Sequence, residues 1–218
     1  MRKLILLGLT SMLVACSALP ERSQHNDYHY QVNSNSDSWR YVWLPDAYSE
    51  PALLKKKFAT YQSFYIAPTQ LAVQESEFTE AELREFANFL ESEAQKKLGA
   101  YKTPVSAPQV NGLNVQFALV NVETPNSILA VTSTVLPVGL AISFASLLAT
   151  GEHTNVTTAR IEVLISDGET GEPLFAAIDP TAGDKSLDNI IDPEQEIKKI
   201  LKVWVDKLGH TLEQLPKS

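Results

Sequence analysis

The chain has 218 residues, of which 44% are hydrophobic and 20% charged, and its formal net charge is −8. This composition is typical of a folded globular protein and excludes an intrinsically disordered chain. The acidic balance argues against nucleic acid as a partner, because a phosphate backbone repels an acidic surface. The single cysteine excludes an intrachain disulfide, so the fold depends on its hydrophobic core.

The N-terminal 15 residues have the layout of a signal peptide: a positively charged start, an apolar run over 4–12, then small residues. That run is shorter than the roughly 20 residues that cross a bilayer. The last three of these residues and the one that follows, Leu13-Val14-Ala15-Cys16, resemble the lipobox of bacterial lipoproteins. The resemblance implies cleavage after Ala15 and lipidation of Cys16 by diacylglycerol and a palmitate-type acyl chain. Acyl chains of this kind would hold the protein on a membrane.

Cleavage would remove Arg2 and Lys3 and leave 203 residues (218 − 15), with 16 basic against 26 acidic side chains. Ser17, and not aspartate, follows the lipidated cysteine. By resemblance to sorting in enteric-type bacteria, this favours the periplasmic face of the outer membrane. The membrane is therefore one expected partner, through the N-terminal lipid anchor.

Residues 16–38 are predicted to be the lipidated cysteine and a flexible tether, because polar side chains dominate and no apolar face repeats. Such a tether has a root-mean-square span of about 25 Å. His25 and His29 lie in this polar segment and are interpreted as solvated side chains, so no metal site is predicted. A single periplasmic domain is expected from 39 to 218.

The domain is expected to open with an irregular packed segment at Trp39–Pro45, a short helical turn over 52–61 and a buried strand over 63–67. A helix is then predicted over 80–98. Thr79 and Glu82 form a capping box, and Gly99 can take a left-handed C-cap. Its apolar stripe is Leu83, Phe86, Ala87, Leu90, Ala94 and Leu98. Its glutamates are interpreted as a solvated face.

In the second half of the domain, the sequence pattern predicts three strands and a helix. Apolar residues alternate over 113–119 and again over 159–165, and residues 174–178 are apolar. The turn over 167–171 makes the last two strands a hairpin, in which Asp167 and Thr170 are expected to hydrogen-bond their own turn. Asp192-Pro193 opens the last helix. Its stripe is Ile197, Ile200, Leu201, Trp204, Val205, Leu208, Leu212 and Leu215.

Residues 128–149 are 22 residues without a charge. Their length permits a membrane span, but Pro137 and Gly139 interrupt the middle. Three interpretations stay open: a buried core element bent at this point, an apolar surface that faces a membrane or a second copy, and a true span.

Several blocks of the second half resemble one family of uncharacterised bacterial lipoproteins, domain of unknown function 3313. The blocks are residues 133–142, 150–156, Glu162, 167–174, Asp179 and 183–185. The similarity runs from about Tyr61 to Leu212. It implies a lipoprotein without an assigned role and carries over no catalytic residue.

The expected fold is an α/β (α+β) two-layer sandwich, with a mixed sheet of about four strands, two main helices and the apolar insertion. The strand–helix–strand start favours a parallel pair, and the order is similar to the TolB N-terminal domain by analogy alone.

No nucleophile elbow, zinc-binding helix or dinucleotide-binding loop is present, and Glu152-His153 beside Asn155 is interpreted as a capped turn. The protein is therefore expected not to be an enzyme and to need no cofactor. The favoured function is a non-catalytic interaction or assembly module with an unidentified envelope partner or a second copy. The alternative is a carrier of an apolar ligand or lipid through residues 128–149.

Overall fold

The computed structural model describes residues 28–32, 38–73, 76, 78–123, 158–182 and 193–213. The lipobox, the apolar stretch 128–149, the cluster around Glu152-His153 and the predicted N-cap Asp192 lie outside these residues. The helical elements are η1 (Asp46–Tyr48), α1 (Pro51–Ala59), α2 (Glu80–Leu98) and α4 (Pro193–Glu213). The strands are β1 (Tyr28–Val32), β2 (Tyr41–Pro45), β3 (Ser63–Ile66), β4 (Gln70–Leu71), β5 (Thr103–Pro104), β6 (Gly112–Glu123), β7 (Thr158–Asp167) and β8 (Pro173–Ala182).

Within the described part of the chain, eight strands form one mixed sheet in the order β1-β2-β8-β7-β6-β3-β5, with β4 also beside β6. Strands β6, β7 and β8 form a continuous antiparallel ladder, and β3 runs parallel to β6. The α/β class, the parallel start and the hairpin are thus confirmed. The expected number of about four strands was too low. Two of the additional strands, β4 and β5, have two residues each and leave no repeating pattern in the sequence.

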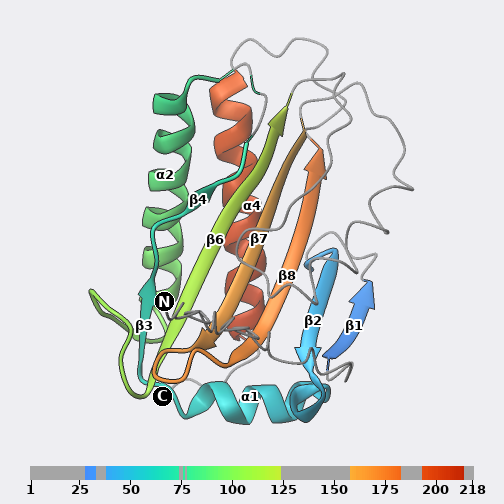
Figure 1. Cartoon of the computed structure of the whole chain (residues 1–218), viewed down its shortest axis with the longest axis vertical. Coiled ribbons are helices and arrows are strands. Elements are labelled where there is room, and N and C mark those ends of the chain that lie inside the picture. The colour runs from blue at the N-terminus through green and yellow to red at the C-terminus, as the bar shows by residue number, and fades with distance from the viewer. Residues whose placement is uncertain are drawn as a thin grey trace, which may run out of the picture.

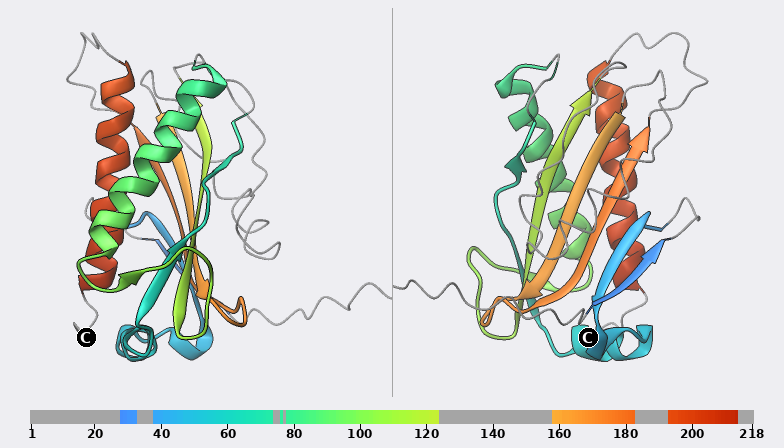
Figure 2. Two further views of the ribbon diagram at one scale, coloured as in Figure 1. Left: turned by 90° about the vertical axis from the view of Figure 1, so that its left-hand side faces the viewer. Right: turned by 45° about the vertical axis from the view of Figure 1, so that its right-hand side comes forward.

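Helices α2 and α4 pack together on one face of the sheet, and α1 crosses one end of it (Figures 1 and 2). The predicted apolar stripe of α2 is buried along its whole length. The capping box at Thr79 and Glu82 is confirmed, because each side chain bonds the other residue's backbone N–H. The predicted left-handed cap at Gly99 was wrong. Gly99 has φ −61° and continues the right-handed turn, donating its N–H to Gln95.

The opposite face of the sheet also carries a buried apolar cluster. Its members are Trp43, Ala118, Val120, Leu164, Ala176 and Ile178. Alternation along β7 places Glu162 on this face as well, opposite Ala118, and Glu162 is fully buried. The three central strands therefore bury both of their faces.

Strand β1 corrects the predicted tether. Residues Tyr28–Val32 pair antiparallel with all five residues of β2, from Tyr28 opposite Pro45 to Val32 opposite Tyr41. The predicted tether therefore does not extend through residues 28–32. Strand β2 also replaces the irregular segment expected before Pro45, and its residues Val42, Trp43 and Leu44 are buried.

Candidate functional site

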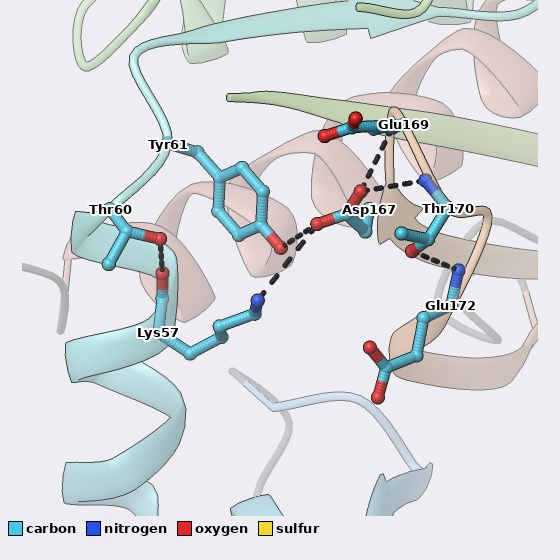
Figure 3. A network of polar contacts seen from close by, with 7 residues as sticks. All are labelled: Lys57, Thr60, Tyr61, Asp167, Glu169, Thr170 and Glu172. Atoms are coloured by element: carbon cyan, nitrogen blue, oxygen red, sulfur yellow. Dashed lines mark hydrogen bonds and ion pairs between the residues drawn. The ribbon is translucent and has the colours of Figure 1, made fainter. Parts of the chain in front are cut away.

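A well-defined polar cluster in the described residues is built around Asp167, where β7 turns into β8 near α1 (Figure 3). One carboxylate oxygen of Asp167, Oδ1, accepts from the backbone N–H groups of Glu169 and Thr170, both at 2.9 Å. The Thr170 hydroxyl accepts from the N–H of Glu172 at 3.2 Å. The expectation that Asp167 and Thr170 bond their own turn is confirmed.

The other oxygen of Asp167, Oδ2, reaches out of the turn. It accepts from the Tyr61 hydroxyl at 2.7 Å and lies 3.9 Å from Nζ of Lys57. The same Lys57 ammonium lies 5.2 Å from the centre of the Tyr61 ring. The hairpin turn is thus joined to the end of α1 and the start of β3, which lie about a hundred residues earlier in the chain.

The electrostatics of this pair suit a structural contact. Burial and the hydrogen bond to Asp167 raise the pKa of Tyr61 well above its ordinary value of 10. The hydrogen bonds from Tyr61 and from the Thr170 backbone lower the pKa of Asp167 to about 2. At neutral pH the phenol keeps its proton and the carboxylate keeps its charge. A general acid or base works best with a pKa near the working pH, and neither group has one.

A close backbone approach completes this corner. The N–H of Gly168 donates to the carbonyl of Gly112 at 2.8 Å. A Cβ at Gly168 would lie 2.7 Å from the carbonyl oxygens of both Gln109 and Gly112. The amide of Gln109 in turn donates to the Ser63 hydroxyl at 2.9 Å. Gly168 therefore allows the turn to pack on the loop that leads into β6.

A second polar cluster lies inside the core between β8 and α4. Oδ2 of Asp179 accepts from Nζ of Lys207 at 2.6 Å and from the N–H of Arg40 at 3.1 Å. Nε1 of Trp204 lies 3.4 Å from Oδ1 of the same carboxylate. Both side chains of the ion pair are almost fully buried, at 3% and 9% exposure. The cluster thus fastens α4 to β8 and to the start of β2.

The family resemblance in the sequence included Asp179 but gave no sign of its partner. The residue that could have identified the partner of Asp179 is Lys207. It follows Trp204 by one helical turn and so lies on the apolar stripe of α4. A lysine in that position, with an aspartate in an apolar strand, predicts a buried ion pair.

Another buried charged side chain is Lys102, after α2. Its Nζ donates to the backbone carbonyl of Tyr61 at 2.6 Å, and burial lowers its pKa. The adjoining apolar cavity has a volume of about 10 Å³. This is roughly the space that one water molecule needs. The lining residues are Phe64, Leu98, Tyr101, Lys102, Leu113, Val115 and Ile165.

The outer surface of the helical layer carries paired charges. Lys97 lies 3.0 Å from Asp206, and Lys198 lies 2.8 Å from Glu85, so each pair joins α2 to α4. Glu91, expected to face water, instead accepts from the N–H of Thr69 at 2.6 Å. The two exposed ion pairs, Lys97–Asp206 and Lys198–Glu85, contribute little to stability.

No group of three or more potential ligands that could hold a metal ion occurs among the residues described here. In the same part of the chain, no helix combines the length and the apolar character that crossing a membrane requires. The one site residue predicted from the sequence, Cys16, and the cluster around Glu152-His153 both lie outside the described residues.

These features define an α/β protein whose described polar clusters fasten the elements of the fold to each other. The chain belongs to the family described as "Protein of unknown function (DUF3313)", whose family model matches residues 50–208. The resemblance found in the sequence is thereby confirmed. No curated protein matches the chain.

Several solved structures resemble the chain loosely. The PelC dodecamer from Paraburkholderia phytofirmans has 7% identity and a TM-score of 0.36, over 66% of this chain and 89% of that one. Lipoprotein GNA1162 from Neisseria meningitidis has 10% identity and a TM-score of 0.36, over 68% and 99%. A minor lipoprotein from Acinetobacter baumannii has 12% identity and a TM-score of 0.28, over 72% and 98%.

Proposed function

We propose that the protein is a lipid-anchored lipoprotein of the bacterial envelope that acts as a non-catalytic interaction or assembly module. The observation that carries the proposal is the lipobox-like run that ends in the chain's single cysteine, Cys16. Ser17, and not aspartate, after Cys16 supports a position on the periplasmic face of the outer membrane. Its partner is an envelope protein or a second copy of the chain.

The chemistry of the described clusters supports the non-catalytic part of the proposal. Both oxygens of Asp167 are used within the fold, and Asp179 is used in the same way inside the core. The Tyr61 and Asp167 pKa values are shifted away from neutrality. The cluster around Asp167 therefore favours a structural role over proton transfer.

The test of the anchor is acyl labelling of the full-length precursor in growing cells. The wild-type chain should incorporate labelled fatty acid and sediment with the outer membrane. Cys16→Ser should remain uncleaved and unlabelled, and the matched variant Ser17→Ala should behave as wild type. Fatty-acid labelling of Cys16→Ser at the wild-type level would overturn the anchor.

The test of the module is crosslinking in intact cells, followed by purification of the lipidated protein. A stable crosslinked envelope protein or a crosslinked second copy supports an interaction module. A lipid that co-purifies in stoichiometric amount, without any crosslinked protein, would overturn it in favour of an apolar-ligand carrier.

A further inference from the structure

The end of the domain crossed by α1 is the end at which the chain arrives from the proposed anchor. The first described residue, Tyr28, pairs with Pro45, and Pro45 leads directly into η1 and α1. Figure 1 shows that β1 begins beside η1 and α1 and runs away from them along the sheet. The position of Tyr28 therefore decides which end of the domain lies nearest the lipid.

The length of the intervening chain strengthens this assignment. Eleven residues, 17–27, separate Cys16 from Tyr28. A flexible segment of that length has a root-mean-square span of about 17–20 Å. Strand β6 has 12 residues, which corresponds to a length of about 40 Å. If residues 17–27 form the flexible tether that their sequence predicts, their average reach is about half the length of the sheet, which favours the α1 end as the end nearest the membrane.

The outer surface of α1 has the character of a membrane-contacting helix. Leu54 and Phe58 are buried under the sheet, whereas Leu53 is 45% exposed. Lys55 and Lys56 are also exposed, and the helix contains no acidic residue. Val110, which is 57% exposed, lies in the loop before β6 at this same end.

We propose that α1 rests on the surface of the membrane that carries the anchor, with Leu53 at the interface and Lys55 and Lys56 on anionic phospholipid headgroups. The inference depends on the lipidation of Cys16 given in the proposed function. Lys56 follows Leu53 by three positions and lies beside it on the helix surface, whereas Lys55 lies on the other side of the helix. An apolar side chain next to a lysine suits this boundary, because the apolar group leaves water while the ammonium stays among the phosphates. The exposed acids Asp46 and Glu50 precede the helix and offset part of this attraction, so the contact depends on Leu53 and the two lysines together.

The experiment measures contact between α1 and lipid in the lipidated full-length protein. The chain is reconstituted in vesicles of one part phosphatidylglycerol to four parts phosphatidylcholine that also carry a headgroup-linked quencher. A fluorophore is attached at Leu53→Cys, which is the only reactive thiol once Cys16 is acylated. The control is Val203→Cys, because Val203 has a similar exposure, 44%, on α4. Quenching at Leu53 should exceed quenching at Val203 several-fold.

Charge reversal tests the lysines. Lys55→Glu with Lys56→Glu should reduce the quenching at Leu53 to the level at Val203. The matched variant, Lys199→Glu with Lys202→Glu on the outer face of α4, should leave it unchanged. Equal quenching at Leu53 and Val203 in acylated protein would overturn the docking of α1 and leave the anchor intact. Absence of acyl label from the same samples would overturn the anchor and the docking together.

Discussion

At the scale of single residues, Asp167 carries more of this fold than its place in a surface turn indicates. Its two oxygens act in different directions, because one closes the β7–β8 turn and the other joins Tyr61 near α1. The sequence predicted the first role, since an aspartate at the start of a glycine-containing turn bonds the turn itself. It could not predict the second, since the contact joins residues 106 positions apart and neither segment has a pattern that identifies the other.

The pH dependence of stability should reflect this pair. The pKa of Asp167 in the folded protein is lowered to about 2 from 3.8, so the unfolded state binds more protons between these values. The stability that Asp167 contributes is therefore present above about pH 4 and is lost as the pH falls toward 2. Tyr61→Phe should lower the free energy of unfolding at pH 7 by about 1–3 kcal/mol. It should also reduce the acid dependence, as measured by urea unfolding between pH 2 and pH 7.

The control for this prediction is a double-mutant cycle. Tyr61→Phe combined with Asp167→Asn should cost clearly less than the sum of the two single changes, because the two side chains share one hydrogen bond. Additive costs and an unchanged acid slope in Tyr61→Phe would contradict the assignment.

Two glycines of the same turn should respond differently to substitution. A Cβ at Gly168 would collide with two backbone carbonyl oxygens, so Gly168→Ala should cost about 2–3 kcal/mol. Gly171 has φ +73° and open space around it, so Gly171→Ala meets only the backbone preference. Its cost should be about 1 kcal/mol. Thermal and urea unfolding of both variants checks the order, and a larger loss at Gly171 would contradict it.

At the scale of elements, the helices and central strands could be predicted because each has a regular apolar pattern. Helix α2 begins and ends at the predicted residues, since the capping box fixes its start and one apolar face fixes its length. Strand β8 was predicted to end near Ile178, before Asp179. It continues to Ala182, since residues 179–182 pair with β7, and Lys207 on α4 compensates the buried charge of Asp179. Such compensation comes from another element and is invisible in a local pattern.

The ion pair between α4 and β8 should contribute far more than the exposed pair on the same helix. Lys207→Met leaves the carboxylate of Asp179 buried without its countercharge, which should cost about 3–5 kcal/mol. Asp206→Asn removes the exposed partner of Lys97 and should cost less than about 1 kcal/mol. Chemical unfolding of the two variants measures the difference. Equal costs would show that the buried pair contributes no more than an exposed one.

At the scale of the whole molecule, the sequence predicted the two-layer class but underestimated the width of the sheet. Residues Tyr28, Tyr30 and Val32 alternate with His29 and Gln31, which is the period of a strand. That signal was hidden by the polar segments on both sides of it. The irregular form expected for Trp39–Pro45 was wrong for a related reason, because a strand with three consecutive apolar residues, Val42, Trp43 and Leu44, that ends in proline shows no simple alternation.

The pairing of β1 with β2 changes what is expected of truncated chains. A chain that begins at Ser38 lacks the five-residue ladder and leaves β2 as an open edge, so it should melt about 5 °C below a chain that begins at Cys16. A chain that begins at Asp27 keeps the ladder and should melt with the chain that begins at Cys16. Calorimetry of the chains that begin at Cys16, Asp27 and Ser38 decides this. Coincident melting of all three would show that β1 adds no stability.

The direction of β1 also determines how the domain bears mechanical load. In a chain held by its N-terminus, a pull acts on Tyr28 along the axis of β1 and toward the α1 end of the sheet. The force therefore runs parallel to the strand, and the hydrogen bonds to β2 are loaded in shear and must yield together. The opposite strand direction would have let the same force peel them apart one at a time. The first strand of the domain would thus carry tension between the proposed lipid anchor and the rest of the protein.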